Sequence, residues 1–114
     1  MTREYKDYIE DIADSMGKAM RFLEHMNFDE FTKDEKTIFA VVRALEIIGE
    51  AVKQIPAPIR RKYPEIPWRE MAGMRDKVIH EYFGVDLKII WNVVKERIPV
   101  LKPTFEKIRE DYDD

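Results

Sequence analysis

The stretch KDEKTIFAVVRALEIIGEAVKQI, residues Lys33–Ile55, decides the fold of this chain of 114 residues. Its apolar residues recur at steps of three and four, the period at which side chains share one side of an α-helix. The residues on this side are Ile38, Val41, Val42, Leu45, Ile48, Gly49, Val52 and Ile55. A glycine inside a helix costs about 1 kcal/mol of helix propensity, so Gly49 indicates that another helix passes close by. The stretch therefore predicts a long helix with one buried face.

The residues before this stretch predict a first long helix and a turn. Apolar residues at the same helical spacing run from Tyr5 to Met26, and we read Asn27–Phe31 as the end of that helix and a short turn. Thr32 and Glu35 then fit a capping box, in which Thr32 is the N-cap and Glu35 is the third helical residue. We therefore expect the second helix to begin directly after Thr32.

Prolines interrupt the chain after the second helix. Four of them break up residues 56–67 and leave room for at most one helical turn, around Ile59–Tyr63. Pro67 suits the first position of a third helix, because a proline there loses no helical hydrogen bond. We expect this third helix to end at Gly84.

The fourth predicted helix begins after Asp86 and contains two prolines. Pro99 and Pro103 can kink this helix or end it early, and we expect a kinked continuation because the apolar spacing persists past both of them. Four long helices with short loops predict an all-α fold, an antiparallel four-helix bundle with an extra short helix. Residues 1–110 would form a single domain, and residues 111–114 would form a frayed tail.

The composition limits the class of protein. No run approaches the roughly 20 apolar residues of a membrane span, and the charged N-terminal residues lack the apolar core of a signal peptide. We therefore expect a soluble, cytoplasmic protein with no membrane contact. The absence of cysteine rules out disulfides and thiolate metal sites.

Positive charge is concentrated in one segment, although the whole chain carries a net charge of −3. Residues 53–77 hold seven Lys/Arg against three Asp/Glu, whereas the segments on either side are net acidic. A local positive field attracts a polyanion even on an acidic protein, and the alternative is a solvated loop face. The cations that we assign to RNA binding are Arg60, Arg61, Lys62, Arg69 and Lys77.

The segment RDKVIHEY, Arg75–Tyr82, holds the residues with the clearest chemistry. The guanidinium of Arg75 is a permanent cation whose shape matches a phosphate, and His80 can move protons near neutral pH. Five residues on a straight helix separate the two by about 140°, so they do not share a face. They can meet if the helix loosens before Gly84, or if two copies of the segment face each other across a twofold axis.

A dimer would also meet the needs of metal-free RNA cleavage. Internal transfer requires a base at the ribose 2′-hydroxyl, an acid at the leaving 5′-oxygen and a cation at the charged phosphorane. One copy offers one good histidine, whereas two copies offer two histidines and two arginines. The alternative is that Arg75 and His80 cap and pair near a helix end, with Tyr82 in the core.

Other candidate groups have structural explanations. The carboxylates of Glu46 and Glu50 lie one helical turn apart and could hold a divalent ion, but such groups more often pair with neighbouring cations, here Arg43 and Lys53. His25 is the other histidine of the chain, and we interpret it as structural because no partner for it is evident.

Two strings resemble the HepT-type toxins of the HEPN superfamily of helical RNA-cleaving domains. RALEIIGEA, Arg43–Ala51, looks like the second helix of these proteins, and PWREMAGMRDKVIHEYFGVD, Pro67–Asp86, looks like their active-site region. The resemblance spans about residues 1–110. The order of arginine, four residues, histidine, one residue and tyrosine is kept in full, with a polar residue, Asp76, after the arginine.

The resemblance implies a homodimeric, metal-independent ribonuclease without a cofactor, the toxin of a type VII-like toxin–antitoxin pair. Arg75 and His80 would take the catalytic places, with Asp76 supporting them. The partner would be a small nucleotidyltransferase of the minimal type, which attaches AMP to Tyr82 (AMPylation). An adenylyl group would bring negative charge and bulk beside Arg75 and so occupy the place of the scissile phosphate.

Two other functions stay open at this stage. The domain could be a binding module that partners a minimal nucleotidyltransferase and helps bind nucleotide or substrate, without cleaving RNA itself. It could also be a structural helical dimer without a ligand, and then Arg75 and His80 would point away from any cleft.

Overall fold

Helices account for all the regular structure that the computed structural model describes, in residues 3–77 and 86–113. In chain order these are α1 (Tyr5–Phe22), α2 (Phe28–Lys33), α3 (Glu35–Val52), α4 (Ala57–Lys62), α5 (Trp68–Ala72), α7 (Leu87–Asn92), the π-helical segment η1 (Val93–Arg97) and α8 (Ile98–Asp113). Residues 74–77 form a further helical turn after α5. The predicted all-α class is confirmed, whereas the expected helix end at Gly84 lies outside the described residues.

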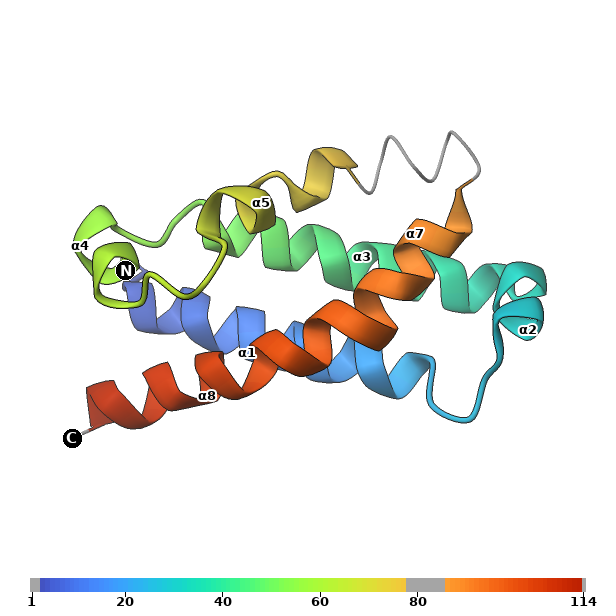
Figure 1. The fold of residues 1–114 in the computed structure, drawn as a ribbon, viewed down its shortest axis with the longest axis horizontal. Helices are drawn as coiled ribbons and strands as arrows, with labels where there is room; N and C mark the ends of the chain where they lie inside the picture. The colour runs from blue at the N-terminus through green and yellow to red at the C-terminus, as the bar shows by residue number, and fades with distance from the viewer. Residues whose placement is uncertain (1–2, 78–85, 114) are drawn as a thin grey trace.

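The three longest helices lie along the long axis of the molecule, and α1 packs against both α3 and α8 (Figure 1). α5 packs on α3, while α2 contacts both α3 and α7. Figure 1 shows α7, η1 and α8 as one continuous helical arm, and both ends of the chain lie at the end of the molecule where α4 is found. The side of α3 that carries α5 is therefore the side on which the candidate site is built.

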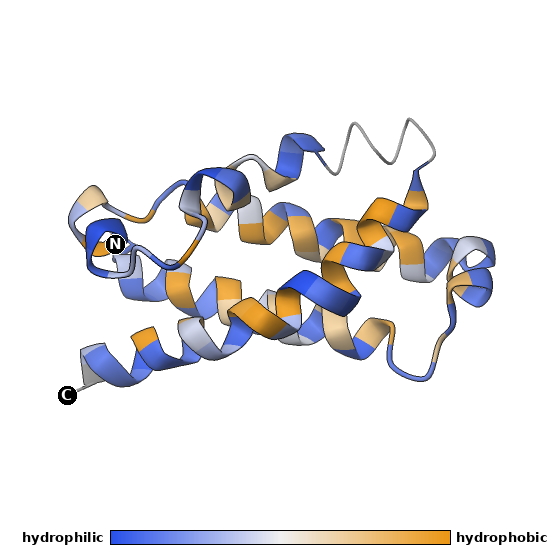
Figure 2. Cartoon of the chain, in the orientation of Figure 1, coloured by the Kyte–Doolittle hydropathy of each residue, from blue (hydrophilic) through white to orange (hydrophobic). Residues whose placement is uncertain are grey.

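The core lies between these helices, each of which buries one side. Hydrophobic and hydrophilic residues alternate along α1, α3 and α8 (Figure 2), as expected for helices with one buried face. The apolar side predicted for α3 is confirmed, since Leu45, Ile48 and Val52 are completely buried. Within the described residues, every helix is too short or too polar to cross a membrane.

α1 ends at Phe22 rather than near Met26, and the segment expected to be a turn forms the helix α2. Asn27 is the N-cap of α2. Its side chain accepts a hydrogen bond from the backbone of Glu30, whose carboxylate accepts one from the backbone N–H of Asn27. This reciprocal capping box nucleates a helix that carries Phe31, one of the largest fully buried side chains.

The capping box predicted at Thr32 and Glu35 is wrong. Thr32 lies inside α2, where its hydroxyl donates a hydrogen bond to the backbone carbonyl of Asp29. The N-cap of α3 is Asp34, whose carboxylate accepts from the backbone N–H of Thr37 at 3.0 Å. This hydrogen bond lowers the pKa of Asp34, as expected when a helix N-terminus favours the charged form.

The last helical arm continues past both of its prolines, as predicted. The chain widens into η1 directly before Pro99, and the backbone N–H of Ile98 donates to the carbonyl of Val93, five residues back. Proline has no N–H, and its ring crowds the carbonyl four residues earlier. A wider turn at this point is therefore a way to keep the arm helical through Pro99 and on past Pro103.

The C-terminal end of α8 is held against the rest of the molecule. Where a frayed tail was expected from residue 111, α8 stays helical to Asp113. The hydroxyl of Tyr63 donates a hydrogen bond to Asp111 at 2.6 Å, and the hydroxyl of Tyr112 donates to Glu10 at 2.8 Å. Burial, together with the hydrogen bond to Asp111 and the charge of that carboxylate, raises the pKa of Tyr63 to about 12.

Replacing Tyr63 with Phe should weaken the pH dependence of stability between about pH 10 and pH 12. An unfolded tyrosine loses its proton near pH 10, whereas folded Tyr63 keeps it to about 12. The folded state therefore binds more protons in this window, and the free energy of unfolding of the wild type falls as the pH rises. Denaturant unfolding across this window measures the slope. Tyr8→Phe is the control, and equal slopes for wild type and Tyr63→Phe would contradict the assignment.

Candidate functional site

Arg75 lies on the helical turn of residues 74–77, which packs directly onto α3 at Gly49. A Cβ atom added to Gly49 would lie 2.8 Å from the backbone nitrogen of Arg75 and 3.5 Å from the backbone carbonyl oxygen of Met71. Because Cβ atoms essentially never come that close to backbone, only glycine permits this contact. The close approach predicted at Gly49 is confirmed, and the backbone that approaches is that of Arg75 itself.

α5 anchors this turn to the core. Trp68 and Met71 are buried, and Pro67 is the N-cap of α5 rather than its first residue. The predicted third helix is interrupted at Gly73, where α5 ends and a turn precedes residues 74–77. The backbone N–H of Lys77 then donates to the carbonyl of Gly73 at 3.0 Å, so a helical turn resumes at once.

Two carboxylates of α3 lie beside the guanidinium of Arg75. Its Nε lies 3.5 Å from Oε1 of Glu50 and 3.9 Å from Oε2 of Glu46. Glu50 also pairs with Arg43, whose Nη1 lies 3.5 Å from the same oxygen. The Arg75 side chain is 47% exposed, whereas that of Glu46 is only 20% exposed. We call Arg43, Glu46, Glu50 and Arg75 the α3 charge cluster.

In the α3 charge cluster, Glu46 and Glu50 form ion pairs with cations, as the sequence indicated. The expected pair between Glu50 and Arg43 is present, but the second cation is Arg75 rather than the expected Lys53. In the part of the chain that the structure describes, there is no group of three acidic or histidine side chains placed to hold a metal ion. Arg75 is the cation that Glu46 and Glu50 share.

The remaining residues of the predicted catalytic segment divide into two groups. Asp76 and Lys77 are exposed on the same turn as Arg75. His80 and Tyr82 lie outside the described residues. His25, the other histidine, lies exposed in the turn after α1 with a left-handed backbone angle φ of 65°. It lines a groove with residues of η1 and α8, away from α3.

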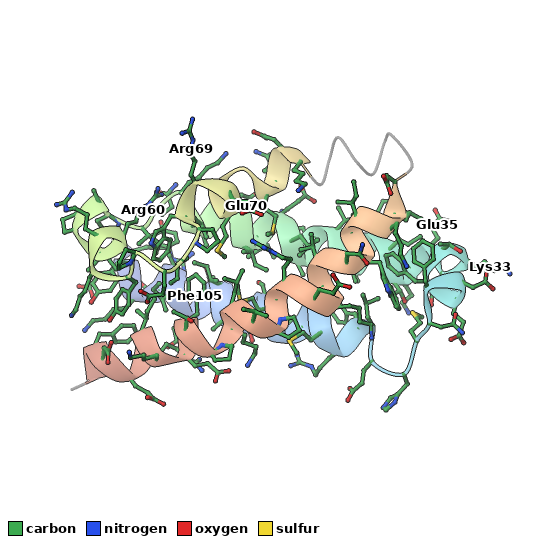
Figure 3. All side chains as sticks on the ribbon, in the orientation of Figure 1. Lys33, Glu35, Arg60, Arg69, Glu70 and Phe105 are labelled. Carbon is green, nitrogen blue, oxygen red and sulfur yellow. The ribbon has the colours of Figure 1, made fainter. Side chains whose placement is uncertain are left out.

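The cations assigned to RNA binding differ in solvent exposure and in whether hydrogen bonds within the protein hold them. Arg60 is only partly exposed, and its guanidinium donates to the carbonyl oxygens of Ile55 at 3.0 Å and Val52 at 2.8 Å, so it caps the C-terminal end of α3. Arg61, Lys62 and Arg69 are exposed. Figure 3 shows Arg69 extending from α5 away from the body of the molecule.

A small apolar cavity lies beside the turn, between α5 and the arm of α7 and η1. Its volume is about 40 Å³, and its lining includes Met71, Met74 and Ile90. Glu70 of α5 and Arg97 of η1 also border it and pair at 3.2 Å. Because one water molecule needs about 10–15 Å³ of such space, the cavity has room for only a few waters.

A family model described as "Ribonuclease HepT-like" matches residues 12–108. The chain belongs to the HepT-like ribonuclease family. A protein of Thermococcus cleftensis named "Probable ribonuclease HepT" is 57% identical over 110 residues, which are 96% of this chain and 100% of that protein. A protein of Methanocaldococcus jannaschii, provisionally named as an RNase, is 49% identical over 97% of this chain and 92% of its own length. No solved structure matches the chain.

The match to the HepT-like family extends over the arginine on the 74–77 turn. The predicted resemblance to HepT-type proteins is confirmed by the family match and by these relatives. The sequence singled out Arg75 and a close approach at Gly49, but it did not show that Gly49, Glu46 and Glu50 lie around Arg75. Their spacing of three and four residues placed them on one side of a helix, but it carried no information about which segment lies opposite.

Replacing Gly49 with Ala should destabilise this HepT-like protein by about 1–3 kcal/mol, the usual cost of overpacking. The added Cβ would meet the backbone nitrogen of Arg75 at 2.8 Å, and backbone cannot rotate away as a side chain can. Gly17→Ala is the matched control, because the new Cβ in α1 would meet only the side chains of Arg21 and Lys102, at 3.4 Å and 3.6 Å.

The control should gain up to about 1 kcal/mol, because alanine has the higher helix propensity. Denaturant unfolding of both variants measures the two effects. Stabilisation of the Gly49→Ala variant to the same extent as Gly17→Ala would contradict the close contact at Gly49.

Proposed function

We propose that this chain is a metal-independent endoribonuclease that acts as a symmetric homodimer. The observation that carries the proposal is the placement of Arg75 in a member of the HepT-like ribonuclease family. Its backbone is fixed on α3 at Gly49 and its guanidinium is half exposed, so a phosphate from solvent can reach it. A fixed, accessible arginine is what stabilisation of a charged phosphorane requires.

The chemistry that we propose is internal transfer within RNA. His80 of one protomer takes the proton of a ribose 2′-hydroxyl, and the resulting oxygen attacks the adjacent phosphorus. The bond from phosphorus to the 5′-oxygen breaks, and His80 of the second protomer gives that oxygen a proton. The products are a 2′,3′-cyclic phosphate and a free 5′-hydroxyl. Arg75 stabilises the extra negative charge on the phosphorane between these steps, and Asp76 supports the pair.

The dimer that we propose places two copies of the Arg75–Tyr82 segment against each other. In the complete fold, α1, α3 and the arm of α7 to α8 would be joined by the helix of Arg75 in an antiparallel four-helix bundle of the HEPN type. The α1 helix already packs on α3 and α8, which is consistent with such a bundle. RNA would reach the site along the exposed cations Arg61, Lys62, Arg69 and Lys77.

We further propose that the protein is the toxin of a type VII-like toxin–antitoxin pair. A minimal nucleotidyltransferase would transfer AMP from ATP to the hydroxyl of Tyr82 and release pyrophosphate. Tyr82 lies seven residues after Arg75, nearly on the same side of a straight helix. The phosphate of the adenylyl group would then compete for Arg75 and block RNA.

Purified protein should cleave RNA in the presence of a chelator, and Arg75→Ala and His80→Ala should each lose at least about a hundredfold in rate. Arg109→Ala is the control, because this arginine pairs with Glu10 on α1, away from α3, and its activity should match the wild type. Gel analysis of fragment ends should show cyclic phosphates. A wild type that binds the nucleotidyltransferase but leaves RNA intact would favour the binding-module alternative.

Incubation with the nucleotidyltransferase and ATP should add AMP to Tyr82 and abolish RNA cleavage. Intact-mass and peptide mass spectrometry locate the adduct. Tyr82→Phe should stay unmodified and active under the same conditions, whereas Tyr112→Phe, which removes a hydroxyl bonded to Glu10 on α1, should be modified like the wild type. Silencing of Tyr82→Phe by the enzyme and ATP would contradict the proposed modification site.

A further inference from the structure

We propose that Glu46 and Glu50 are positioning residues that hold the guanidinium of Arg75 in the orientation that meets the scissile phosphate. This inference rests on the ribonuclease function proposed above and adds two residues of α3 to the site. Neither carboxylate would touch RNA. Each would act through Arg75, with which both form ion pairs.

The geometry of the α3 charge cluster supports an orienting role. Both carboxylates make their closest approach to Arg75 at Nε, at 3.5 Å from Glu50 and 3.9 Å from Glu46. Nε is the inner nitrogen of the guanidinium, next to the aliphatic chain. The two terminal nitrogens form the outer end of the group, and a phosphate can approach them bidentately.

Residues of α3 contact Arg75 both at its backbone and at its guanidinium. The backbone of Arg75 is packed on Gly49, and its head lies beside Glu50, the next residue of α3, and Glu46, one turn earlier. A free arginine side chain samples many rotamers, and ordering it costs entropy when a ligand binds. Attachment of both ends to one helix would remove much of that cost before RNA arrives.

Folding stability does not explain the cluster well. Exposed ion pairs contribute little to stability, and the Arg75 and Glu50 side chains are both well exposed. Two carboxylates beside a phosphate site also repel the substrate. Arg43 offsets part of this charge through its contact with Glu50. The arrangement therefore weakens the binding of RNA but orders the arginine. This is expected where the arginine acts on the transition state, because only interactions that are stronger there than in the bound substrate raise kcat.

This argument predicts opposite effects on substrate binding and on turnover. Changing Glu46 and Glu50 to Gln keeps their shape but removes two negative charges near the substrate. KM should therefore fall severalfold because RNA is repelled less. The value of kcat should fall about tenfold to a hundredfold because the guanidinium is no longer held, the scale expected for a catalytic group misplaced by about 1 Å.

The experiment compares Glu46→Gln, Glu50→Gln and the double variant with Glu70→Gln in cleavage of one defined RNA. Glu70 is the matched control, because its carboxylate pairs with Arg97 rather than with Arg75. The double variant should lower kcat and KM together, and the control should leave both unchanged. Unchanged kcat in the double variant, with thermal melting like the wild type, would overturn the positioning role. A simple loss of fold would lower kcat without lowering KM.

A second measurement tests the positioning role without RNA cleavage. In NMR spectra of the whole protein, the Nε–Hε signal of Arg75, assigned by its loss in Arg75→Lys, should lie away from the position of a free arginine. It should move to that position in the double variant. A wild-type signal already at the free position would overturn the inference even if RNA is cleaved. A wild type that cleaves no RNA would overturn the proposed function, and the NMR result would still decide whether α3 holds Arg75.

Discussion

The contact between the backbone of Arg75 and Gly49 is the constraint on which the site depends. A residue with a side chain at position 49 would push the turn of residues 74–77 away from α3, because its Cβ would meet a backbone nitrogen at 2.8 Å. α3 tolerates glycine there, despite its weak helix propensity, because the neighbouring Ile48 and Val52 are fully buried and hold the helix in place. The helix propensity lost at Gly49 lets the backbone of Arg75 approach α3 closely, and this approach brings the guanidinium of Arg75 next to Glu46 and Glu50.

Much of the fold could be predicted from the spacing of apolar residues, because long amphipathic helices repeat the same signal over many turns. α1, α3 and the α7–α8 arm all follow it. A short helix such as α2 has too few turns for this spacing to repeat. Asn27 with Glu30 and Thr32 with Glu35 are both plausible capping boxes within a few residues, and local chemistry does not rank them. Burial of Phe31, whose ring lies 5.5 Å from that of Trp91 on α7, favours the first box, and that contact joins residues far apart in the sequence.

The candidate site could be predicted only in part. Arg75 stood out because of its residue type and its neighbours, and Gly49 stood out because glycine is costly inside a helix. Nothing in the sequence connected the two, since 25 positions and a proline-rich segment separate them. Glu50 illustrates the same limit. Its pairing with Arg43 on the same helix follows from helical periodicity, whereas its pairing with Arg75 depends on tertiary packing.

The π-helical segment η1 also sets the rotational phase of the last helical arm. Ile90, Val94 and Ile98, all buried, are spaced four residues apart. In a strict α-helix, steps of four advance around the axis by about 40° each, which would turn this row of side chains gradually off the core. A turn of the π-helical segment η1 holds one residue more than a turn of an α-helix. This surplus residue offsets the drift, so the row of Ile90, Val94 and Ile98 stays aligned with the core. A deletion of one residue within 93–97 would remove this surplus and let the arm close as an ordinary α-helix in which α7 and α8 keep their buried faces, whereas a deletion elsewhere in the arm would turn one part relative to the other by about 100°.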